Sequence, residues 1–456
     1  MARVVVIGGG IGGLGVGLFL APRGHDVTVL ERDGAGVPST TGEAWEDWDR
    51  SGVPQFRQVH LFNARSRALL RDDAPHVLAA LHDAGAGLVH LNGPDDDELV
   101  RLTSRRTTYE MVLRRSVLND PRVRFLGGTR VGGLLTDGTA ITGARTEDGR
   151  EWPADLVVDA SGRRSPVGEW LTALGFAPPE RVEEGAPSVA YTRWYRLRTN
   201  EPAPLLRADL GYAVAMIGPA DDRWFCVVFG CVAEDPVMRR LHRNPQAFAA
   251  ATGAIPAVAE WTAPDRVTVE SDVLSTSDRA NRLVRLPRAV PGLALLGDSA
   301  MCTNPGYGRG VALALLHARR LADVLDEHGD DPAAVAGAFS AVTDAELEPW
   351  YHAAVAGERA RFAISRRVLA GEPLHAIGGP GDDPAIRFAR GWGHACQRDI
   401  VVQRAFHRAF QLLEPPSTFW GNPEIEARVE DVWREIDTEP QLPEGPDHEQ
   451  MARLLA

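Results

Sequence analysis

The first 31 residues constrain the fold of this chain more than any other stretch. Residues 3–7 form an apolar, largely β-branched run, which predicts a buried parallel strand. A run of glycines follows at once, and residues 14–20 continue as an apolar helix. Residues 27–30 predict a second strand, which ends at Glu31. This order of strand, glycines, helix, strand and acid predicts a βαβ unit that binds a dinucleotide.

The glycine run fits the pattern G-x-G-x-x-G, and each of its glycines has a physical task. Gly8 allows the tight turn out of the strand, Gly10 lets the backbone approach a pyrophosphate, and Gly13 lets the helix pack closely on the sheet. Ile11 and Gly12 open the helix, whose free N–H groups and positive dipole end favour phosphates. Because a chain with 46 glycines contains glycine-rich turns by chance, the prediction rests on the whole unit.

Two residues at the end of the second strand complete this predicted site. Glu31 can accept hydrogen bonds from both ribose hydroxyls of the dinucleotide. Arg32 either touches the adenine or is simply exposed, and the sequence leaves both possibilities open. We therefore predict a cofactor site at the carboxyl ends of the first two strands.

Length, charge and cysteine spacing narrow the class of protein. The chain has 456 residues, which suits interleaved domains or one large α/β body. Its net charge of −13 argues against a nucleic-acid partner. Without a long apolar run or a signal-peptide pattern, we expect no membrane span and a cytoplasmic protein. The four cysteines show no metal-ligand spacing, so we expect reduced thiols and no metal site.

Residues 40–158 predict a mixture of loops, helices and short strands. Residues 40–56 lack periodicity and predict a loop, whereas residues 58–70 predict a helix that residues 77–84 extend or repeat. A small β-meander is predicted at residues 123–126, 131–135 and 140–145. A further helix is expected at residues 105–117, and a buried parallel strand at residues 155–158.

The second half of the chain changes character twice. Residues 188–274 are β-rich and predict an inserted antiparallel sheet with a hairpin turn at residues 218–222. Residues 292–296 return to the first sheet, and largely helical sequence follows from residue 310. The acidic, proline-rich residues 438–449 predict a loosely held surface strip. We expect a dinucleotide domain at 1–187 and 286–330, a β-sheet substrate domain at 188–285, and a helical region at 331–456.

Three motifs together resemble the FAD-dependent monooxygenases of the p-hydroxybenzoate hydroxylase type and their epoxidase relatives. The first is the unit from Gly8 to Glu31, the second is ADLVVDASGRRS at residues 154–165, and the third is LLGDSAMCTNPGYGRG at residues 295–310. They occur in the order and at the spacing of that family. The resemblance implies FAD and an α/β fold, in which a Rossmann-like FAD-binding domain carries an inserted antiparallel substrate sheet and a helical C-terminal part.

The third motif implies most of the flavin site. Gly297 ends a strand, and in the family the acid that follows, here Asp298, binds a hydroxyl of the ribityl chain; a helix N-cap is the alternative. Residues 305–310 would lie against the flavin ring, where glycines let the backbone approach closely. The resemblance implies that Pro305, Gly308, Arg309 and Gly310 bind the cofactor, and that the backbone of Pro305, Gly306 and Gly308 is the catalytic surface.

The second motif departs from the commoner form of the family. Many relatives have Ala-Asp-Gly where this chain has Ala-Ser-Gly, and the acid stands earlier, at Asp159. The departure bears on the NAD(P)H contact rather than on FAD. Family members also place an arginine, here Arg106, near the FAD diphosphate, with a solvated helix start as the alternative. His60 is either an acid/base group or a structural hydrogen-bonding residue.

The resemblance implies an FAD-dependent monooxygenase that uses NAD(P)H and O2. In such enzymes the reduced flavin forms a C4a-hydroperoxide, which hydroxylates an aromatic ring or epoxidises an alkene. A flavin-dependent halogenase, a prenyl-type reductase and a non-enzymatic FAD-binding protein remain alternatives, although the halogenase string Trp-x-Trp-x-Ile-Pro is missing. The sequence leaves the oligomeric state open. The inserted sheet predicts a sizeable hydrophobic substrate, as in secondary metabolism, because aromatic residues alternate along it: Tyr191, Trp194, Tyr212, Trp224 and Phe225.

Overall fold

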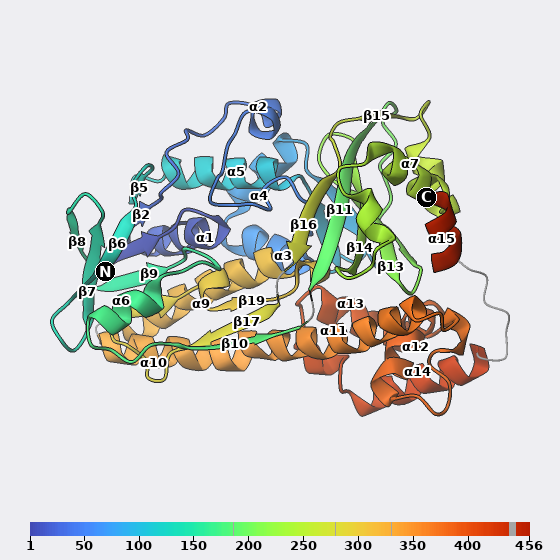
Figure 1. The fold of residues 1–456 in the computed structure, drawn as a ribbon. Helices are drawn as coiled ribbons and strands as arrows, with labels where there is room; N and C mark the ends of the chain where they lie inside the picture. Colours follow the sequence, from blue (N-terminus) through green and yellow to red (C-terminus); the bar gives the residue numbers. More distant parts are fainter. Residues whose placement is uncertain (186, 279, 330, 437–443) are drawn as a thin grey trace.

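A parallel sheet at one end of the molecule carries the N-terminal motif (Figure 1). The computed structural model describes residues 1–185, 187–278, 280–329, 331–436 and 444–456. Five strands lie in the order β18-β9-β1-β2-β5, and each neighbouring pair is parallel. Because β18 follows the inserted segment, the sheet is assembled from two separate stretches of sequence. The strands are β1 (Arg3–Ile7), β2 (Asp26–Leu30), β5 (Val123–Leu126), β9 (Leu156–Asp159) and β18 (Leu293–Leu295).

Helices cover one face of the parallel sheet, and a small antiparallel meander covers the other. Val4 and Val6 of β1 point into a core with α1 (Ile11–Leu20), α5 (Arg106–Asn119) and α9 (Gly310–His328). Successive side chains of a strand alternate between faces, so Val5 and Ile7 point into the second core. That core contains residues of β6 (Val131–Thr136), β7 (Ile141–Thr146) and α6 (Val167–Ala173), and β8 (Glu151–Pro153) completes the meander.

The predicted meander differs from the observed one. Residues 123–126 were expected to be its first strand, but as β5 they pair parallel with β2 at the edge of the large sheet. The meander is instead the order β6-β7-β8. A parallel and an antiparallel edge strand of four residues present the same apolar pattern, so only the crossover through α5 distinguishes them.

Residues 40–83 contain three helices, where a loop was expected first and then a helix that residues 77–84 would extend or repeat. Within the predicted loop lies α2 (Thr41–Glu46), which begins with a capping box of Thr40 and Glu43. The predicted helix at residues 58–70 begins only at Ala64, as α3 (Ala64–Asp73). A separate helix, α4 (Pro75–Asp83), follows because Pro75 occupies its first turn. The strands β3 (Gly87–His90) and β4 (Val100–Thr103) then form a hairpin.

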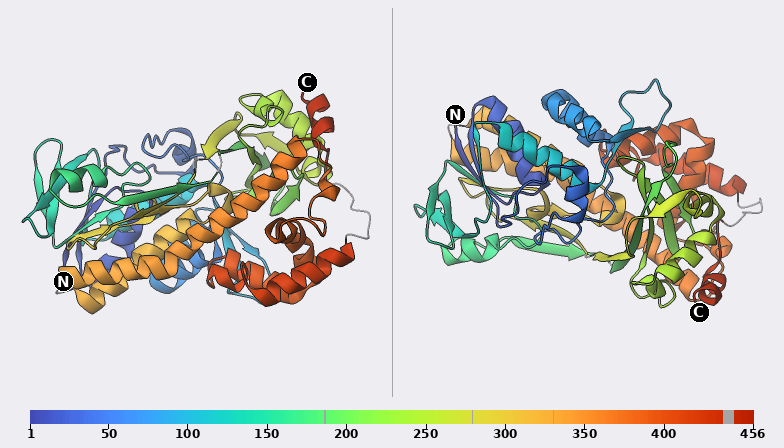
Figure 2. Two further views of the ribbon diagram at one scale, coloured as in Figure 1. Left: turned by 60° about the horizontal axis from the view of Figure 1, so that its bottom comes forward. Right: turned by 90° about the horizontal axis from the view of Figure 1, so that it is seen from above.

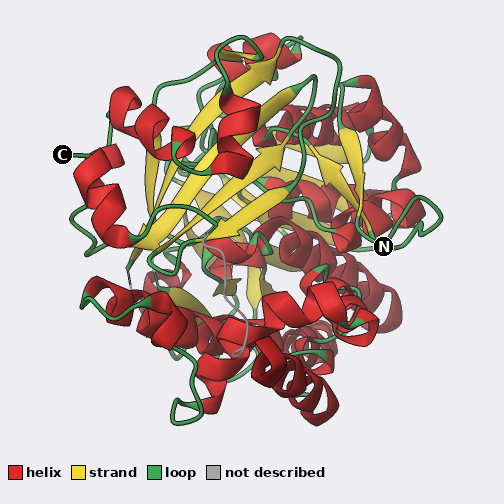
Figure 3. Ribbon diagram, turned by 90° about the vertical axis from the view of Figure 1, so that its right-hand side faces the viewer, coloured by secondary structure: helices red, strands yellow, loops and turns green. Residues whose placement is uncertain are grey.

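The inserted segment folds as an antiparallel sheet, whose strands cross the upper half of Figure 3. Five strands lie in the order β12-β13-β14-β11-β15, and β16 also pairs with β11. One face of this sheet packs on α7 (Pro245–Gly253), α8 (Pro256–Ala259) and the last helix, α15 (His448–Leu454). The strands are β11 (Ser188–Leu197), β12 (Leu206–Asp209), β13 (Ala213–Pro219), β14 (Trp224–Val232), β15 (Val267–Val269) and β16 (Leu274–Asp278).

A long helix links the two ends of the molecule. Figure 2 shows α11 (Glu348–Leu369) running from the parallel sheet toward the inserted sheet. Beside it lies a small sheet of three strands, β10 (Glu180–Glu184), β17 (Asn281–Arg285) and β19 (Met301–Cys302). No helix of the described ranges combines the length and apolar content that a membrane span requires. The other helices of this region are α10 (Pro332–Val342), α12 (Pro384–Arg398), α13 (Ile400–Phe410) and α14 (Pro423–Ile436).

The predicted surface strip at residues 438–449 is only partly observed. Residues 437–443 lie outside the described part of the chain. The remainder is held firmly, since the Tyr212 hydroxyl donates to the Pro446 carbonyl at 3.0 Å and Asp447 caps α15. Met451 of α15 is fully buried in the core of the inserted sheet. The α/β architecture with an inserted antiparallel sheet and a helical C-terminal part is confirmed.

Candidate active site

The predicted motifs meet along one edge of the parallel sheet. The strands β18, β9 and β1 are neighbours and run in the same direction, so the residues that follow them lie side by side. These residues are Asp298 after β18, Asp159 at the end of β9, and the glycine run after β1. Glu31 follows β2, the next strand. Carboxyl ends of parallel strands are the usual place for a ligand in such sheets.

The glycine run adopts the geometry that its pattern predicts. Gly8 has φ +104°, and a Cβ there would lie 2.6 Å from the Ala160 carbonyl oxygen. A Cβ on Gly13 would lie 1.9 Å from the Gly8 carbonyl oxygen, so only a glycine allows the helix to approach the turn this closely. By contrast, no atom lies within 4 Å of a Cβ placed on Gly10. Gly8 and Gly13 thus shape the turn, whereas Gly10 leaves open space beside it.

Glu31 is buried beneath the glycine run and is bonded to the backbone. Its Oε2 atom accepts a hydrogen bond from the Gly9 N–H at 2.7 Å, and its Oε1 atom accepts one from the Asp33 N–H at 2.8 Å. The Oε2 atom also accepts from Arg50 at 3.3 Å, whereas the Oε1 atom has a second lone pair. Glu31 therefore positions the glycine turn and keeps acceptor capacity for a ligand, and its role toward ribose stays a prediction.

Arg50 is a site residue that sequence reasoning missed. Its guanidinium lies between three carboxylates and donates to Asp33 at 3.1 Å, to Glu31 at 3.3 Å, and to Glu110 at a shorter distance. Burial lowers the pKa of Arg50, but Glu110 and Glu31 outweigh burial and the pKa is raised. The residue lies in a segment without periodicity, so only its three-dimensional neighbours identify it.

Arg106 and His60 extend this charged group toward the third motif. Arg106 donates to Glu110 at 3.1 and 3.2 Å and lies 2.9 Å from the His60 Nε2 atom. The His60 Nδ1 atom lies 3.0 Å from the Gln58 carbonyl oxygen, so Nδ1 carries the proton and Nε2 accepts from Arg106. Burial and the Arg106 charge lower the pKa of His60 to about 3. Both ring nitrogens are occupied, which favours the structural role of His60 over acid/base chemistry.

Asp159 organises the turn that follows β9. Its Oδ1 atom accepts hydrogen bonds from the Ser161 N–H at 3.0 Å and the Ser161 hydroxyl at 2.6 Å, and its Oδ2 atom accepts one from the Ser165 hydroxyl. The side chain is fully buried, and burial raises its pKa. In this arrangement Asp159 shapes the backbone beside the glycine run, and a direct contact with the cofactor stays a prediction.

Asp298 lies at the start of the third motif. Gly297 before it has φ +62°, a left-handed conformation that favours glycine. Burial raises the pKa of the Asp298 carboxyl, while the charges of Arg106, Arg282 and Arg163 act in the opposite direction. Asp298 opens only a single short turn, Gly297–Ser299, in which its side chain caps no helix. The N-cap alternative is thereby disfavoured, and the ribityl contact stays a prediction.

The loop of residues 304–310 has a buried side and an exposed side. Asn304 and Arg309 are buried, whereas Pro305, Gly306 and Gly310 are exposed. Gly308 has φ +61°, and a Cβ there would lie 2.6–2.8 Å from Leu61. The backbone of this loop is therefore accessible at Pro305, Gly306 and Gly310, where the family resemblance predicts the flavin ring. The Arg309 side chain is directed into the protein.

Comparisons with known proteins agree with this geometry. A family model described as an FAD binding domain matches residues 1–337. The chain is 26% identical to aurachin C monooxygenase/isomerase of Stigmatella aurantiaca over 73% of this chain and 83% of that protein. It is also 26% identical to kynurenine 3-monooxygenase of Salinispora tropica, over 73% of this chain and 75% of that protein.

Solved structures show the same fold. A probable FAD-dependent monooxygenase from Pseudomonas aeruginosa superposes with a TM-score of 0.59 at 20% identity, covering 80% of this chain and 99% of that one. A flavin-dependent brominase superposes with a TM-score of 0.61 at 16% identity, covering 96% of this chain and 99% of that one. At these identities the two structures establish the fold alone.

The chain belongs to the FAD-dependent monooxygenase family. It is an FAD-dependent oxidoreductase, and FAD is its cofactor. Its family match at residues 1–337 includes all three motifs.

The residues of this monooxygenase fit FAD. Two helices, α1 and α9, begin at the same edge of the sheet, and no side chain caps either of them. Open space lies beside Gly10 before α1 and beside Gly310 at the start of α9. Uncapped helix N-termini attract phosphate and negatively charged groups, and glycines admit a ligand to the backbone. Both features are required of a flavin dinucleotide site.

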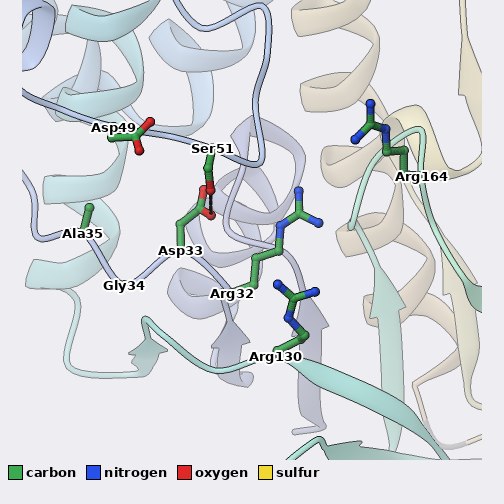
Figure 4. Close-up of a pocket in the computed structure, with 8 residues that line it drawn as sticks. All are labelled: Arg32, Asp33, Gly34, Ala35, Asp49, Ser51, Arg130 and Arg164. Carbon is green, nitrogen blue, oxygen red and sulfur yellow. Dashed lines mark hydrogen bonds between the residues drawn. The ribbon is translucent and has the colours of Figure 1, made fainter.

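Arg32 lines a pocket of about 450 Å³ beside the end of β2 (Figure 4). Arg130 and Arg164 border the same pocket, so three guanidinium groups surround it. On the opposite side the Ser51 hydroxyl donates to the Asp33 carboxylate at 3.1 Å. The Arg32 side chain is exposed, and its contact with the adenine stays a prediction.

The aromatic residues of the inserted sheet divide between its two faces. Tyr191, Tyr212 and Phe225 belong to the core beneath α7, α8 and α15. Trp194 and Trp224 point to the other face, where they contact Trp45 of α2 with ring centroids 5.6 and 5.1 Å away. All five are buried. The sheet face that continues from Trp194 toward the loop of residues 304–310, called the flavin loop below, is built from smaller residues.

Within the described ranges, no group of three or more His, Cys, Asp or Glu side chains is placed so that it could hold a metal ion.

Proposed function

We propose that this FAD-dependent monooxygenase uses NAD(P)H and O2 to hydroxylate or epoxidise a sizeable hydrophobic small molecule. When bound, FAD would supply the redox chemistry that activates O2. The exposed backbone of Pro305 and Gly306, beside the half-buried Gly308, carries this proposal, because it lets a flat ring and a substrate approach the same loop. No ionisable side chain is required on that surface. The task of the protein is to bind and orient the cofactor and the substrate and to exclude water.

The face of the inserted sheet supports the hydrophobic substrate class. Ser188, at the start of β11, accepts a hydrogen bond from Asn304 of the flavin loop at 3.3 Å, so the face that holds Ser188 begins at that loop. Residues of this face alternate with the core residues described above. They are mostly small or apolar, with one hydroxyl among them: Ala190, Thr192, Val214, Met216, Val228 and Gly230.

The electron donor is part of the same proposal. Family relatives of this size carry no second dinucleotide domain, and only one G-x-G-x-x-G unit occurs at the start of the chain. We propose that NADH or NADPH reduces the flavin at the site that FAD occupies. Flavin reduction followed at the absorbance maximum of FAD, with NADH, with NADPH and with an added flavin reductase, separates these donors.

One experiment tests the reaction type. The FAD-loaded protein is incubated with NAD(P)H, isotopically labelled O2 and a panel of hydrophobic aromatic and alkene compounds, and products are analysed by mass spectrometry. Incorporation of one labelled oxygen atom is expected. Halide-dependent products would support a halogenase, and reduced alkenes formed without O2 would support a prenyl-type reductase; either result would contradict the proposal.

The brominase neighbour makes halogenation the second candidate, because it covers 96% of this chain, including the C-terminal helices. The missing Trp-x-Trp-x-Ile-Pro string argues against it. Adding bromide or chloride to the same assay distinguishes the two without another protein preparation.

A further inference from the structure

The flavin loop, residues 304–310, rests on one stripe of α11, a helix outside the three sequence motifs. Trp350, Ala354 and Glu358 are four residues apart and therefore lie on the same side of the helix. Each contacts a different residue of the loop. The Trp350 ring lies 4.8 Å from the Arg309 guanidinium, the Ala354 carbonyl accepts from the Tyr307 hydroxyl at 3.2 Å, and the Glu358 carboxylate accepts from Asn304 at 2.8 Å.

Glu358 is the polar end of this stripe. Its side chain is buried, with 3% of the residue exposed. The Oε1 atom accepts from the Asn304 Nδ2 atom, and the Oε2 atom accepts from the Asn281 Nδ2 atom of β17. Burial raises the pKa of Glu358, whereas the two amides and the charge of Arg361 act against that rise. No ion pair to Glu358 forms within the described part of the chain.

The two amide groups have only one possible orientation. The Asn304 Oδ1 atom accepts a hydrogen bond from the Gly306 N–H at 2.8 Å. The Asn281 Oδ1 atom accepts one from the Asn304 N–H at 2.6 Å. Because both amide oxygens are bonded to backbone N–H groups, both NH2 groups must face Glu358. Two acceptor oxygens are then required at Glu358, and an ionised carboxylate provides both without a hydrogen that would itself need a buried acceptor.

We infer that Glu358 is a positioning residue for the flavin, since its carboxylate holds Asn304 and, through it, the Gly306 backbone. The inference rests on the proposed function, because it takes residues 304–310 to face FAD. It extends that function to the C-terminal region, which would set the position of the flavin loop. A misplaced Gly306 N–H would have to be reordered whenever the cofactor binds.

The substitution Glu358→Gln tests this inference at constant shape. A glutamine has one acceptor oxygen, so its NH2 group would face the NH2 group of one asparagine and leave a buried donor unpaired. We expect the loop to move so that this donor finds another partner, and FAD to bind at least about tenfold more weakly, because returning the loop to its place on binding restores the cost of the unpaired donor. The full-length protein is freed of flavin, and FAD is titrated by fluorescence quenching.

A second substitution should restore the bonding pattern. With Asn304→Asp added to Glu358→Gln, the acid moves to the loop: it accepts from Gly306 and from the glutamine NH2, and the glutamine oxygen accepts from Asn281. The Ser188 hydroxyl, which accepts from Asn304 at 3.3 Å, can reverse and donate. We expect FAD affinity within about threefold of wild type. Glu426→Gln, at an exposed position of α14, is the matched control and should change nothing.

The outcomes separate this inference from the proposed function. Weak binding in Glu358→Gln with recovery in the double variant supports it, and the visible circular dichroism of bound FAD should shift and recover in parallel. Wild-type affinity in Glu358→Gln, or no recovery in the double variant, overturns it while FAD binding by the wild type stands. A wild-type protein that takes up no FAD contradicts the proposed function itself.

Discussion

Two buried arginines stand behind the two glycine loops of the site, and the protein holds them in different ways. Arg50, behind the N-terminal glycine run, is surrounded by the carboxylates of Glu31, Asp33 and Glu110. Arg309, in the flavin loop, has no hydrogen-bond acceptor for any of its three guanidinium nitrogens among the described residues. Four aromatic rings surround it instead, with centroids 4.8–5.7 Å away: Tyr307, Trp350, Phe410 and Trp420.

The difference teaches what each arginine does for the fold. The carboxylates around Arg50 raise its pKa against burial. Without Arg50, the buried Glu31 and Asp33 would lose their ion pairs, whereas Glu110 would keep its contacts with Arg106 and Arg114. Burial lowers the pKa of Arg309 to about 10, because aromatic faces compensate only part of the lost hydration. Arg50 is therefore a structural requirement of the first loop, whereas Arg309 is a cation that the second loop tolerates.

The largest expected effect is that of Arg50→Met. Removing the cation leaves three buried carboxylates together, and we expect the free energy of unfolding to fall by about 3–5 kcal/mol. Urea unfolding followed by circular dichroism measures it. Arg71→Met, which breaks an exposed pair with Asp72, is the control and should cost less than about 1 kcal/mol. Equal effects of the two substitutions would remove the distinction between buried and exposed ion pairs.

The glycine run offers a sharper comparison within the first loop. In Gly13→Ala the new Cβ would meet the Gly8 carbonyl at 1.9 Å, and we expect a loss of about 3 kcal/mol of stability together with FAD binding. Gly10→Ala meets no atom within 4 Å, so the apoprotein should keep its melting temperature while FAD affinity falls. Thermal unfolding without FAD and titration with FAD separate these outcomes. A destabilised Gly10→Ala apoprotein would mean that this glycine shapes the turn itself.

In the second loop, replacing Gly308 by alanine should cost less stability than replacing Gly13. Gly308→Ala must adopt φ +61° and displace Leu61, at an expected cost of about 1–2 kcal/mol. Because Leu61 is a side chain rather than backbone, Leu61→Ala in the same protein should recover part of that cost. Thermal unfolding of the two single variants and the double variant measures the coupling. Strictly additive effects would show that backbone strain, rather than the contact with Leu61, is the cause.

A further test concerns the pH dependence of folding stability that the lowered pKa of His60 causes. Its folded pKa of about 3 lies below the ordinary value of 6.5, so the unfolded chain binds a proton first as the pH falls. Stability is therefore present above pH 6.5 and is lost progressively toward pH 3, by about 2 kcal/mol at pH 5. His60→Gln, which keeps an acceptor for Arg106, should flatten that part of the curve. Identical pH profiles would mean that His60 is accessible to protons in the folded state.

The smallest effect is expected from Arg309→Met. A methionine can fill the space among four aromatic rings and removes an unpaired buried charge, so stability should change by less than about 1 kcal/mol. The measurement is urea unfolding beside Arg50→Met. A loss of several kcal/mol would show that the aromatic rings stabilise the guanidinium as strongly as carboxylates do, and the comparison between the two loops would fail.

The sequence by itself determined the first loop and the family of this protein. Strand, glycines, helix and Glu31 act on one another within 31 residues, and the contact of Gly13 with the Gly8 carbonyl is a local consequence of that order. The same holds for the strand β18, which precedes Gly297, and for the inserted antiparallel sheet, whose hairpin pattern is also local. Constraints between residues that are close in sequence appear as a fixed spacing of residue types, and they can therefore be predicted.

Tertiary structure alone decided what stands behind both loops. Arg50 meets Glu110 across 60 positions, and Glu358 meets Asn304 and Asn281 across 54 and 77. Nothing in the periodicity of α11 distinguishes Glu358 from a solvated glutamate, and nothing in residues 40–56 distinguishes Arg50 from a loop arginine. The physical reason is that burial and hydrogen-bond partners belong to pairs of distant segments, and a pair exists only once the chain has folded.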